Sequence, residues 1–554
     1  MLTVKRLYLY GVLGVALVLL LWGLTDLVRF VLDELAQVAG STPAFGGQFL
    51  REELSRAVAL VLVAGSIFAV HLALVRRSLR GSAAEIADER ASASRATYFF
   101  LVLAGTAIAT SMALFEVGDQ LISMMAFGER SWDLVSPMGS VIVVGSAWVA
   151  HILVRRGDLR SAPARTAGDW LTRAYLYGVL FASALLASFA AAQVLTTVAR
   201  RLLDLRPLWE SAGWWQGAIS GPLAGALVVS AGWLIHWLLA DRLLHAPDPM
   251  GEAHRSSGTR RGYFLAVVLA SAGAVLVLAT MSLQNVFAEM LGAWRSIDGS
   301  RLIEDIGGPL LMIAPFTLAW WWHIRRVSRE SLALGGPVAA RASTRTGRLV
   351  VATVGLAGLA AGLAWSVQLL LDAVGTSSRA SLFSTAVLAD GVAPALAIGL
   401  VGLVLWTPAW ALSQRDRAAH AVEAATSTSR RAYLLLVSGL AVIAAMGSLA
   451  FLVWQATRLL LESGDLHDSS WALAILLVAA IVLIYHLWQL RSDLLVARVS
   501  DAMEPEPPAP DAAPRELETI HISAPPGADF RVLNAAIRSE LPDGYELRII
   551  PHTV

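Results

Sequence analysis

The sequence predicts an all-α polytopic membrane protein with twelve transmembrane helices, arranged as six tandem two-helix repeats. Three observations support this prediction. Apolar residues gather in blocks of about 18 or more, which is long enough to cross a bilayer. A short residue pattern returns around these blocks at a regular spacing, which indicates a repeat architecture. Arginine is concentrated in alternate connecting loops, as in proteins that cross a membrane many times.

The composition is far more apolar than that of a soluble domain. Hydrophobic residues make up 56% of the chain and charged residues 15%, and the mean hydropathy is +0.62. Soluble domains carry about 25% charged residues. The predicted spans are residues 7–30, 55–76, 97–121, 135–155, 173–198, 219–241, 262–287, 306–325, 348–372, 387–412, 432–457 and 471–491.

The repeat has a signature at the start of its first helix and another at the end of its second. The first helix opens with Arg, one or two residues, and then Tyr; the second closes with an aromatic residue, a His and an Arg. Successive starts lie 77 to 90 residues apart. The fifth copy is degenerate, with Arg348 where Tyr is expected. The five intact starts are Arg6 with Tyr8, Arg95 with Tyr98, Arg173 with Tyr175, Arg261 with Tyr263 and Arg431 with Tyr433.

A longer period groups the hairpins in pairs. The residues from Tyr8 to Leu13 return unchanged from Tyr175 to Leu180, 167 residues later. The chain can therefore also be divided into three four-helix modules, over residues 1–165, 166–340 and 341–500.

Beyond the membrane region, residues 501–514 form a Pro-rich acidic linker. Residues 515–554 are then predicted to form a small β-α-β segment, with strand patterns on both sides of a helix over 530–541. Such a segment is too small to hold a core alone. We expect it to dock on the bundle or on another chain, with disorder as the alternative.

The charge bias of the loops predicts the topology. Basic residues recur before odd-numbered spans and after even-numbered ones, whereas the hairpin tips are mostly richer in acid. The tip of the third hairpin is the weakest case, because it carries Arg200, Arg201 and Arg206. Because basic loops stay in the cytoplasm, the sequence predicts a multi-pass protein of the bacterial inner membrane with both termini cytoplasmic. The first span, preceded by Lys5 and Arg6, is too long for a signal-peptide core and is predicted to be a retained anchor.

These repeated helix ends resemble a known family. The Arg-x-Tyr-Leu-Tyr start, together with a second helix that ends in an aromatic residue, His and Arg, is similar to a bacterial integral-membrane domain of unknown function, number 5671, found in Chloroflexi-type bacteria. The resemblance covers most of residues 1–495. It implies a multi-helix membrane protein and no particular activity or catalytic residue.

Five recurrent histidines are the candidate binding residues. Each lies near the end of an even-numbered span, two to six residues before an Arg. A neutral imidazole in an apolar wall could bind a metal or a tetrapyrrole. We favour the alternative that they anchor helix ends at the membrane interface, because the fifth repeat has Trp410 where His is expected. The five histidines are His71, His151, His236, His323 and His486.

Two further recurrent sets have comparable interpretations. The signature tyrosines fit an interfacial aromatic belt, and a Tyr–His hydrogen bond within each hairpin is the alternative. A polar residue late in each odd-numbered span could form a ring or interhelix hydrogen bonds, although ordinary polarity at helix ends explains it as well. The polar set is Asp26, Glu116, Gln193, Gln284, Gln368 and Gln455.

The sequence lacks the usual signs of catalysis or coupled transport. It has no cysteine, no phosphate-binding Gly-rich motif and no paired-carboxylate or His-Glu-x-x-His pattern. No charged residue falls in the middle third of a predicted span, which disfavours an ion-coupled transporter.

We therefore predict a non-enzymatic scaffold, assembly or sensory component without cofactor or metal. Its expected partners are the lipid bilayer and other membrane proteins or further copies of itself, and not nucleic acid. The alternatives are a small-solute transporter or channel, and a protein in which the histidines ligate a tetrapyrrole or metal.

Overall fold

The computed structural model describes residues 2–38, 47–128, 134–160, 169–205, 213–247, 249–292, 303–375, 387–462 and 469–503. These ranges are helical and contain no strand. The chain forms two compact units, Met1–Arg498 and Val499–Val554. Most of the predicted linker and the whole predicted β-α-β segment lie outside the described residues.

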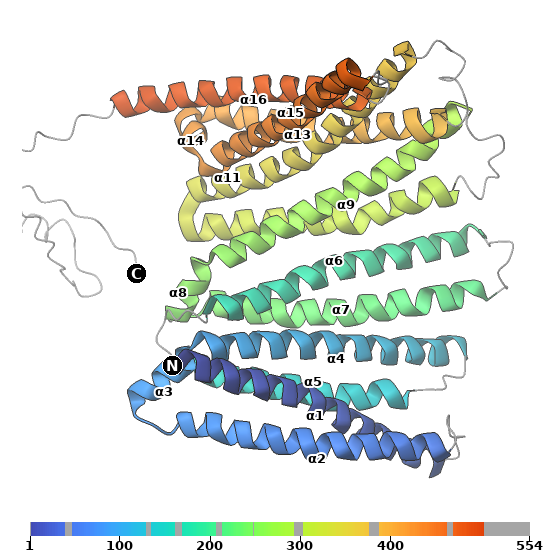
Figure 1. Ribbon diagram of the computed structural model, residues 1–554, viewed down its shortest axis with the longest axis vertical. Coiled ribbons are helices and arrows are strands. Elements are labelled where there is room, and N and C mark those ends of the chain that lie inside the picture. The colour runs from blue at the N-terminus through green and yellow to red at the C-terminus, as the bar shows by residue number, and fades with distance from the viewer. Residues whose placement is uncertain are drawn as a thin grey trace, which may run out of the picture. The chain divides into compact units, whose positions relative to one another are not determined.

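Among the described residues, eleven long helices make up most of the first unit, and they run side by side (Figure 1). Most are longer than predicted, because the helices continue past their apolar stretches at both ends. They are α1 (Leu2–Val38), α2 (Gly47–Ser78), α4 (Ala93–Phe127), α5 (Val135–Arg160), α6 (Asp169–Leu202), α7 (Trp214–Leu244), α9 (Gly258–Met290), α11 (Gly308–Gly375), α13 (Ala393–Ala419), α15 (Thr428–Glu462) and α16 (Ser470–Met503).

Eleven of the described segments are long and apolar enough to cross a membrane. One of them, Glu304–Val374, spans 71 residues because α11 joins two helices across a kink. Gly336 breaks the helix there with φ of 70°, a left-handed backbone conformation that glycine adopts readily. We call residues 308–335 the first part of α11 and residues 337–375 its second part.

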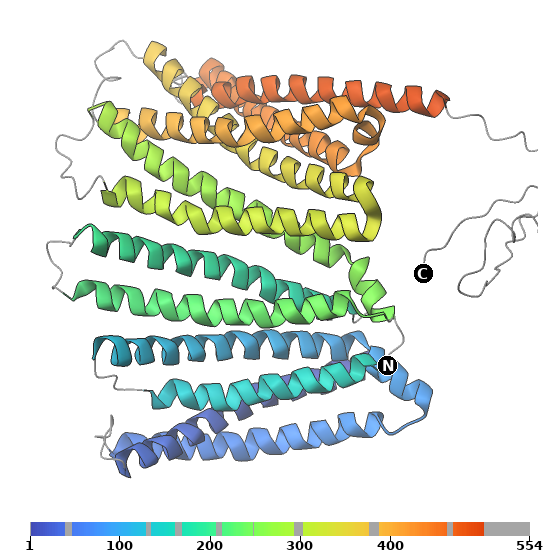
Figure 2. The same cartoon turned by 180° about the vertical axis from the view of Figure 1, so that it is seen from behind.

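Three short helices connect hairpins at one end of the bundle: α3 (Ala83–Ala91), α8 (Pro249–Arg255) and α14 (Ala421–Thr426). All three lie at the end where α1 begins, as both views show (Figures 1 and 2). We call this the arginine end. The hairpins that these short helices connect therefore enter from the same end.

Local sequence explains how several elements start. Ser82 caps α3 in a capping box with Glu85, and the Ser92 side chain caps α4 by accepting from the Arg95 backbone N–H. The helices α11 and α13, which carry Pro309 and Pro394 in their first turns, are each preceded by a turn of π-helix, Ile303–Gly307 and Leu388–Val392. Pro315 and Pro408 lie inside α11 and α13.

The hairpins pack in chain order. The helix α4 packs against α6 and α7 of the next hairpin, and α9 packs in the same way against α11 and α13. Three buried clusters form along this series, around Tyr98, Tyr263 and Tyr433. Many large apolar side chains elsewhere remain exposed, such as Leu62 and Ile443, as expected for helices that face lipid.

Candidate functional site: the arginine end of the helices

Four helix hairpins are closed by a Tyr–His hydrogen bond near the arginine end. The tyrosine lies at the start of the first helix and the histidine near the end of the second, so each bond joins the two helices of one hairpin. The hydroxyl-to-Nε2 distances are 3.0 Å for Tyr98 and His151, 3.2 Å for Tyr175 and His236, 2.7 Å for Tyr263 and His323, and 3.4 Å for Tyr433 and His486.

The second ring nitrogen fixes the direction of these bonds. Nδ1 of each recurrent histidine lies 2.6–2.8 Å from the carbonyl oxygen four residues earlier, as between His323 and Ala319. A carbonyl only accepts, so Nδ1 carries the proton and Nε2 of the neutral ring accepts from the tyrosine hydroxyl. We call each of these four Tyr–His hydrogen bonds a clasp. In the four clasp histidines both ring nitrogens are therefore hydrogen-bonded, and a metal would have to displace the tyrosine.

Indoles connect one hairpin to the next. Trp148 of α5 donates to the Tyr175 hydroxyl of α6 at 2.9 Å, and its ring stacks on His236 with centroids 5.9 Å apart. Trp233 of α7 donates in the same way to Tyr263 of α9 at 3.4 Å. The hydroxyls of Tyr175 and Tyr263 thus each accept a hydrogen bond from the tryptophan of the preceding hairpin and donate one to the histidine of their own hairpin.

The first hairpin differs from the four clasped ones. The rings of Tyr8 and His71 are 5.9 Å apart, and 61% of Tyr8 is exposed. The predicted interfacial anchor fits this pair. It does not fit His236, His323 or His486, which are only 4%, 3% and 1% exposed and serve as interhelix clasps instead.

In the second hairpin of each four-helix module, a buried arginine next to the Tyr–His bond pairs with a carboxylate of the same hairpin. Arg95 donates to Asp158 at 2.7 Å, Arg260 to Glu330 at 2.6 Å and Arg430 to Asp493 at 2.6 Å. These side chains are between 0% and 12% exposed. Because a buried charge is costly unless it is paired and hydrogen-bonded, each pair holds its two helix ends together.

Two of these arginines also reach back to the preceding hairpin. Arg95 donates to the Tyr10 hydroxyl at 2.9 Å, and Arg260 donates to the Tyr177 hydroxyl at 3.1 Å. In the third module Arg430 donates to Ser413 instead, at 3.2 Å. Each arginine therefore joins both hairpins of its four-helix module.

The short connecting helices complete the network. Glu89 of α3 accepts from Tyr10 at 2.7 Å and from Arg6 at 2.8 Å. Glu423 of α14 accepts from Arg341 at 2.8 Å and from Arg345 at 3.2 Å. The hydrogen bond from Arg341, together with the positive charges nearby, lowers the pKa of Glu423.

The sequence contains a signal for this network that the Arg–Tyr signature did not capture. The structural arginines are Arg260 and Arg430, one residue before Arg261 and Arg431. With this register, Ser-x-(Ser/Thr)-Arg-x-x-Tyr occurs in all three modules, and an acidic residue follows the clasp histidine seven positions later. The three starts are Ser92 to Tyr98, Ser257 to Tyr263 and Ser427 to Tyr433, and the acidic residues are Asp158, Glu330 and Asp493.

The fifth hairpin replaces the clasp by close backbone packing. Gly358 on the second part of α11 faces Gly402 on α13, where an added Cβ would lie 3.3 Å from the Gly402 Cα. A Cβ on Gly402 itself would overlap the backbone of Leu359. Small residues that let helix backbones touch are a common way to join membrane helices.

Trp410, predicted to stand in for the missing histidine, contacts the next hairpin. Its Nε1 donates to Tyr485 at 2.6 Å, and its ring centroid is 5.9 Å from that of His486 in the next hairpin. Trp148 lies at a similar distance from His236. Unlike Trp148, however, Trp410 does not donate to the signature tyrosine of the next hairpin, which here is Tyr433.

The polar residues predicted near the opposite end behave individually. Asp26 pairs with Arg56 at 3.2 Å, Gln455 is 8% exposed and Glu116 is exposed. These three side chains therefore do not form a single polar ring.

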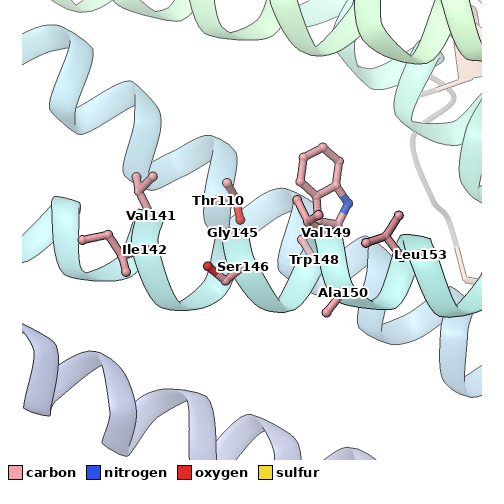
Figure 3. A pocket seen from close by; sticks show the side chains of 9 residues that line it. All are labelled: Thr110, Val141, Ile142, Gly145, Ser146, Trp148, Val149, Ala150 and Leu153. Carbon is pink, nitrogen blue, oxygen red and sulfur yellow. The ribbon is translucent and has the colours of Figure 1, made fainter.

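The described residues include no group of three or more His, Asp or Glu side chains placed to hold a metal ion. One shallow groove lies on α5, where Thr110 of α4 approaches Gly145 and Ser146 (Figure 3). The rest of its lining is mostly apolar, including Val141, Ile142 and Leu153.

Comparison with known families explains the threefold character of the site. The family described as Domain of unknown function (DUF5671) matches over residues 6–146, 173–318 and 345–485. The chain belongs to this family. Each match lies within one predicted four-helix module and begins at an arginine: Arg6, Arg173 and Arg345.

Counting from these three arginines places Gly347, and not Arg348, where Tyr8 and Tyr175 stand in the first two copies of DUF5671. The fifth hairpin has thus lost both members of the clasp. No curated protein and no solved structure matches the sequence.

Proposed function

We propose that this DUF5671 protein is a non-enzymatic scaffold of the bacterial inner membrane, built from twelve spans in three four-helix modules with both termini in the cytoplasm. The observation that supports this function is the use of the polar side chains at the arginine end. Arginine, tyrosine, histidine and carboxylate groups bond to one another in every module, as in the set Arg95, Tyr10, Glu89 and Asp158. These groups brace helices together.

Twelve spans follow if the two parts of α11 cross the membrane separately. Gly336 then lies between two hairpins at the arginine end, as α3 and α8 do in the earlier modules. Reporter fusions after Gly81 and after Ser131 test the orientation. We expect the first to be cytoplasmic and the second to lie on the other side; the same side for both would contradict the topology.

The scaffold function is tested with the purified full chain. In liposomes we expect no flux of protons, potassium or a small dye above that of protein-free vesicles, and no visible absorption band. We also expect that extraction of native membranes into lipid nanodiscs yields the protein as an assembly of more than one copy. Solute flux would favour a transporter, and a Soret band lost on His236→Gln would favour tetrapyrrole ligation.

A further inference from the structure

A groove between α1 and α2 is open on the first module. It is lined by apolar side chains that include Val15, Leu19, Ala59, Leu60 and Val63, with Arg56 at one end. Val15 and Val63 are 64% and 62% exposed.

The corresponding groove of the second module is filled by a helix of the module before it. There α4 packs against α6 and α7. A Cβ added to Gly225 of α7 would lie 3.6 Å from the Phe115 ring, and one added to Gly118 would lie 3.2 Å from the Ala224 Cβ. The third module repeats this contact, because a Cβ on Gly358 would lie 2.8 Å from Leu276 of α9.

Position along the helices shows that the open groove is the same site. Gly225 and Ala224 lie 11 and 12 residues before His236. The same offsets before His71 give Leu60 and Ala59, which both line the groove between α1 and α2. In the described part of the chain, Ala59 is exposed.

The complementary surface is exposed at the other end of the series. The helix α15 holds the place in the third module that α4 and α9 hold in the first two. Phe115 and Gly118 follow Tyr98 by 17 and 20 residues, and the same offsets after Tyr433 give Ala450 and Val453. Both are exposed, and Val453 is 57% exposed.

We propose that a second copy of this chain docks head to tail, with its α15 in the groove between α1 and α2. The contact continues the module-to-module interface that the chain already makes twice. It joins two different surfaces, so it can add copies in series. In lipid it would be held by close packing of apolar and small side chains. This inference rests on the proposed scaffold function and specifies its partner, which is another copy of the protein.

The absence of cysteine makes the contact directly testable. Two single-cysteine variants of the full chain, Ala59→Cys and Val453→Cys, carry different size tags and are co-expressed. A short thiol crosslinker in native membranes should give an adduct that contains both tags. Leu60→Cys with Ala450→Cys should give the second such adduct, and Leu477→Cys, exposed on α16, serves as the control partner for Ala59→Cys.

Other products would contradict head-to-tail docking. An adduct of two Ala59→Cys chains would show a two-fold interface instead, and no adduct above the Leu477→Cys control would show that lipid covers the groove. Ala59→Trp, which fills the groove, should abolish the adduct between Leu60→Cys and Ala450→Cys without lowering the melting temperature of the single chain. Solute flux with an intact adduct would overturn the scaffold function alone, whereas a larger assembly without the adduct would overturn only the docking.

Discussion

At the scale of single residues, the role of each of the four buried or part-buried histidines follows from what its two ring nitrogens contact. In His236, Nδ1 bonds to the Gly232 carbonyl and Nε2 to the Tyr175 hydroxyl, which also accepts from Trp148. The positions of these residues could be read from the sequence. Their burial could not, because an interfacial and a buried histidine have the same spacing from the following arginine.

Tyr175→Phe should destabilise the protein, because it leaves both Trp148 Nε1 and His236 Nε2 without their partner. The expected loss in free energy of unfolding is about 1–3 kcal/mol. Tyr8→Phe is the matched control, since Tyr8 is mostly exposed, and should change stability by less than about 0.5 kcal/mol. Melting temperatures in detergent measure both variants, and an equal loss in the two would contradict the clasp.

The pair of Arg430 and Asp493 gives a second test at this scale. Arg430→Leu leaves a carboxylate that is 1% exposed beside Arg417 alone, which is itself 25% exposed. We expect a loss of about 3–5 kcal/mol, as measured when one partner of a buried ion pair is removed. The double variant Arg430→Leu with Asp493→Leu should recover much of that loss. A double variant less stable than the single one would show that Arg430 does not act through Asp493.

At the scale of helices, five of the hairpins show two ways of joining their two helices. Four use the Tyr–His bond, whereas the fifth brings the backbones of α11 and α13 into contact at Gly358 and Gly402. The span positions and the common entry side could be predicted, because apolar length and loop charge act locally. The exchange of a clasp for glycine packing could not, because it depends on which faces of the two helices meet.

Gly402→Ala should weaken the fifth hairpin, because the new Cβ overlaps the backbone of Leu359 and the helices must separate. Overpacking of this kind costs about 1–3 kcal/mol. Gly439→Ala on α15 is the control, since nothing lies within 4 Å of the added Cβ. Alanine should stabilise that helix by about 0.5–1 kcal/mol. Opposite shifts in melting temperature are expected, and a loss in both would contradict specific packing at Gly402.

The helix α14 should loosen at acidic pH. The pKa of Glu423 is lowered in the folded protein, mainly by the hydrogen bond from Arg341. Its contribution to stability is therefore present above the pKa of the unfolded chain, about 4.5, and is lost as the pH falls through the lower folded value. Hydrogen exchange of residues 421–426 should rise there, and Glu423→Gln should show the raised exchange at neutral pH already. Exchange independent of pH in the unaltered protein would contradict this role.

At the scale of the whole molecule, three copies of one family domain follow one another and are joined by the same contact twice, α4 on α7 and α9 on α13. The 167-residue return of the Tyr8 segment predicted this grouping. The repeat could not reveal which arginine of each adjacent pair forms the buried ion pair. Adjacent arginines such as Arg260 and Arg261 are equivalent in a pattern search, although a helix directs only Arg260 into the buried cluster.

The membrane bundle should fold without the C-terminal segment. Met1–Arg498 and Val499–Val554 form separate compact units. The last residue of the buried Arg–carboxylate pairs described above is Asp493, which precedes the boundary between the units. A stop codon after Ala502 retains every clasp and every Arg–carboxylate pair described above. We expect the truncated chain to insert into the membrane, to elute as a single species in detergent and to melt close to the full chain.

The matched control for this truncation is a stop codon after Leu477. It removes both His486 and Asp493, so Tyr433 loses its clasp partner and the buried Arg430 loses its carboxylate. Because an unpaired buried charge is strongly destabilising, we expect this shorter chain to be degraded. Immunoblots of membrane fractions compare the two truncations. Degradation of the longer truncation as well would show that residues 503–554 brace the bundle.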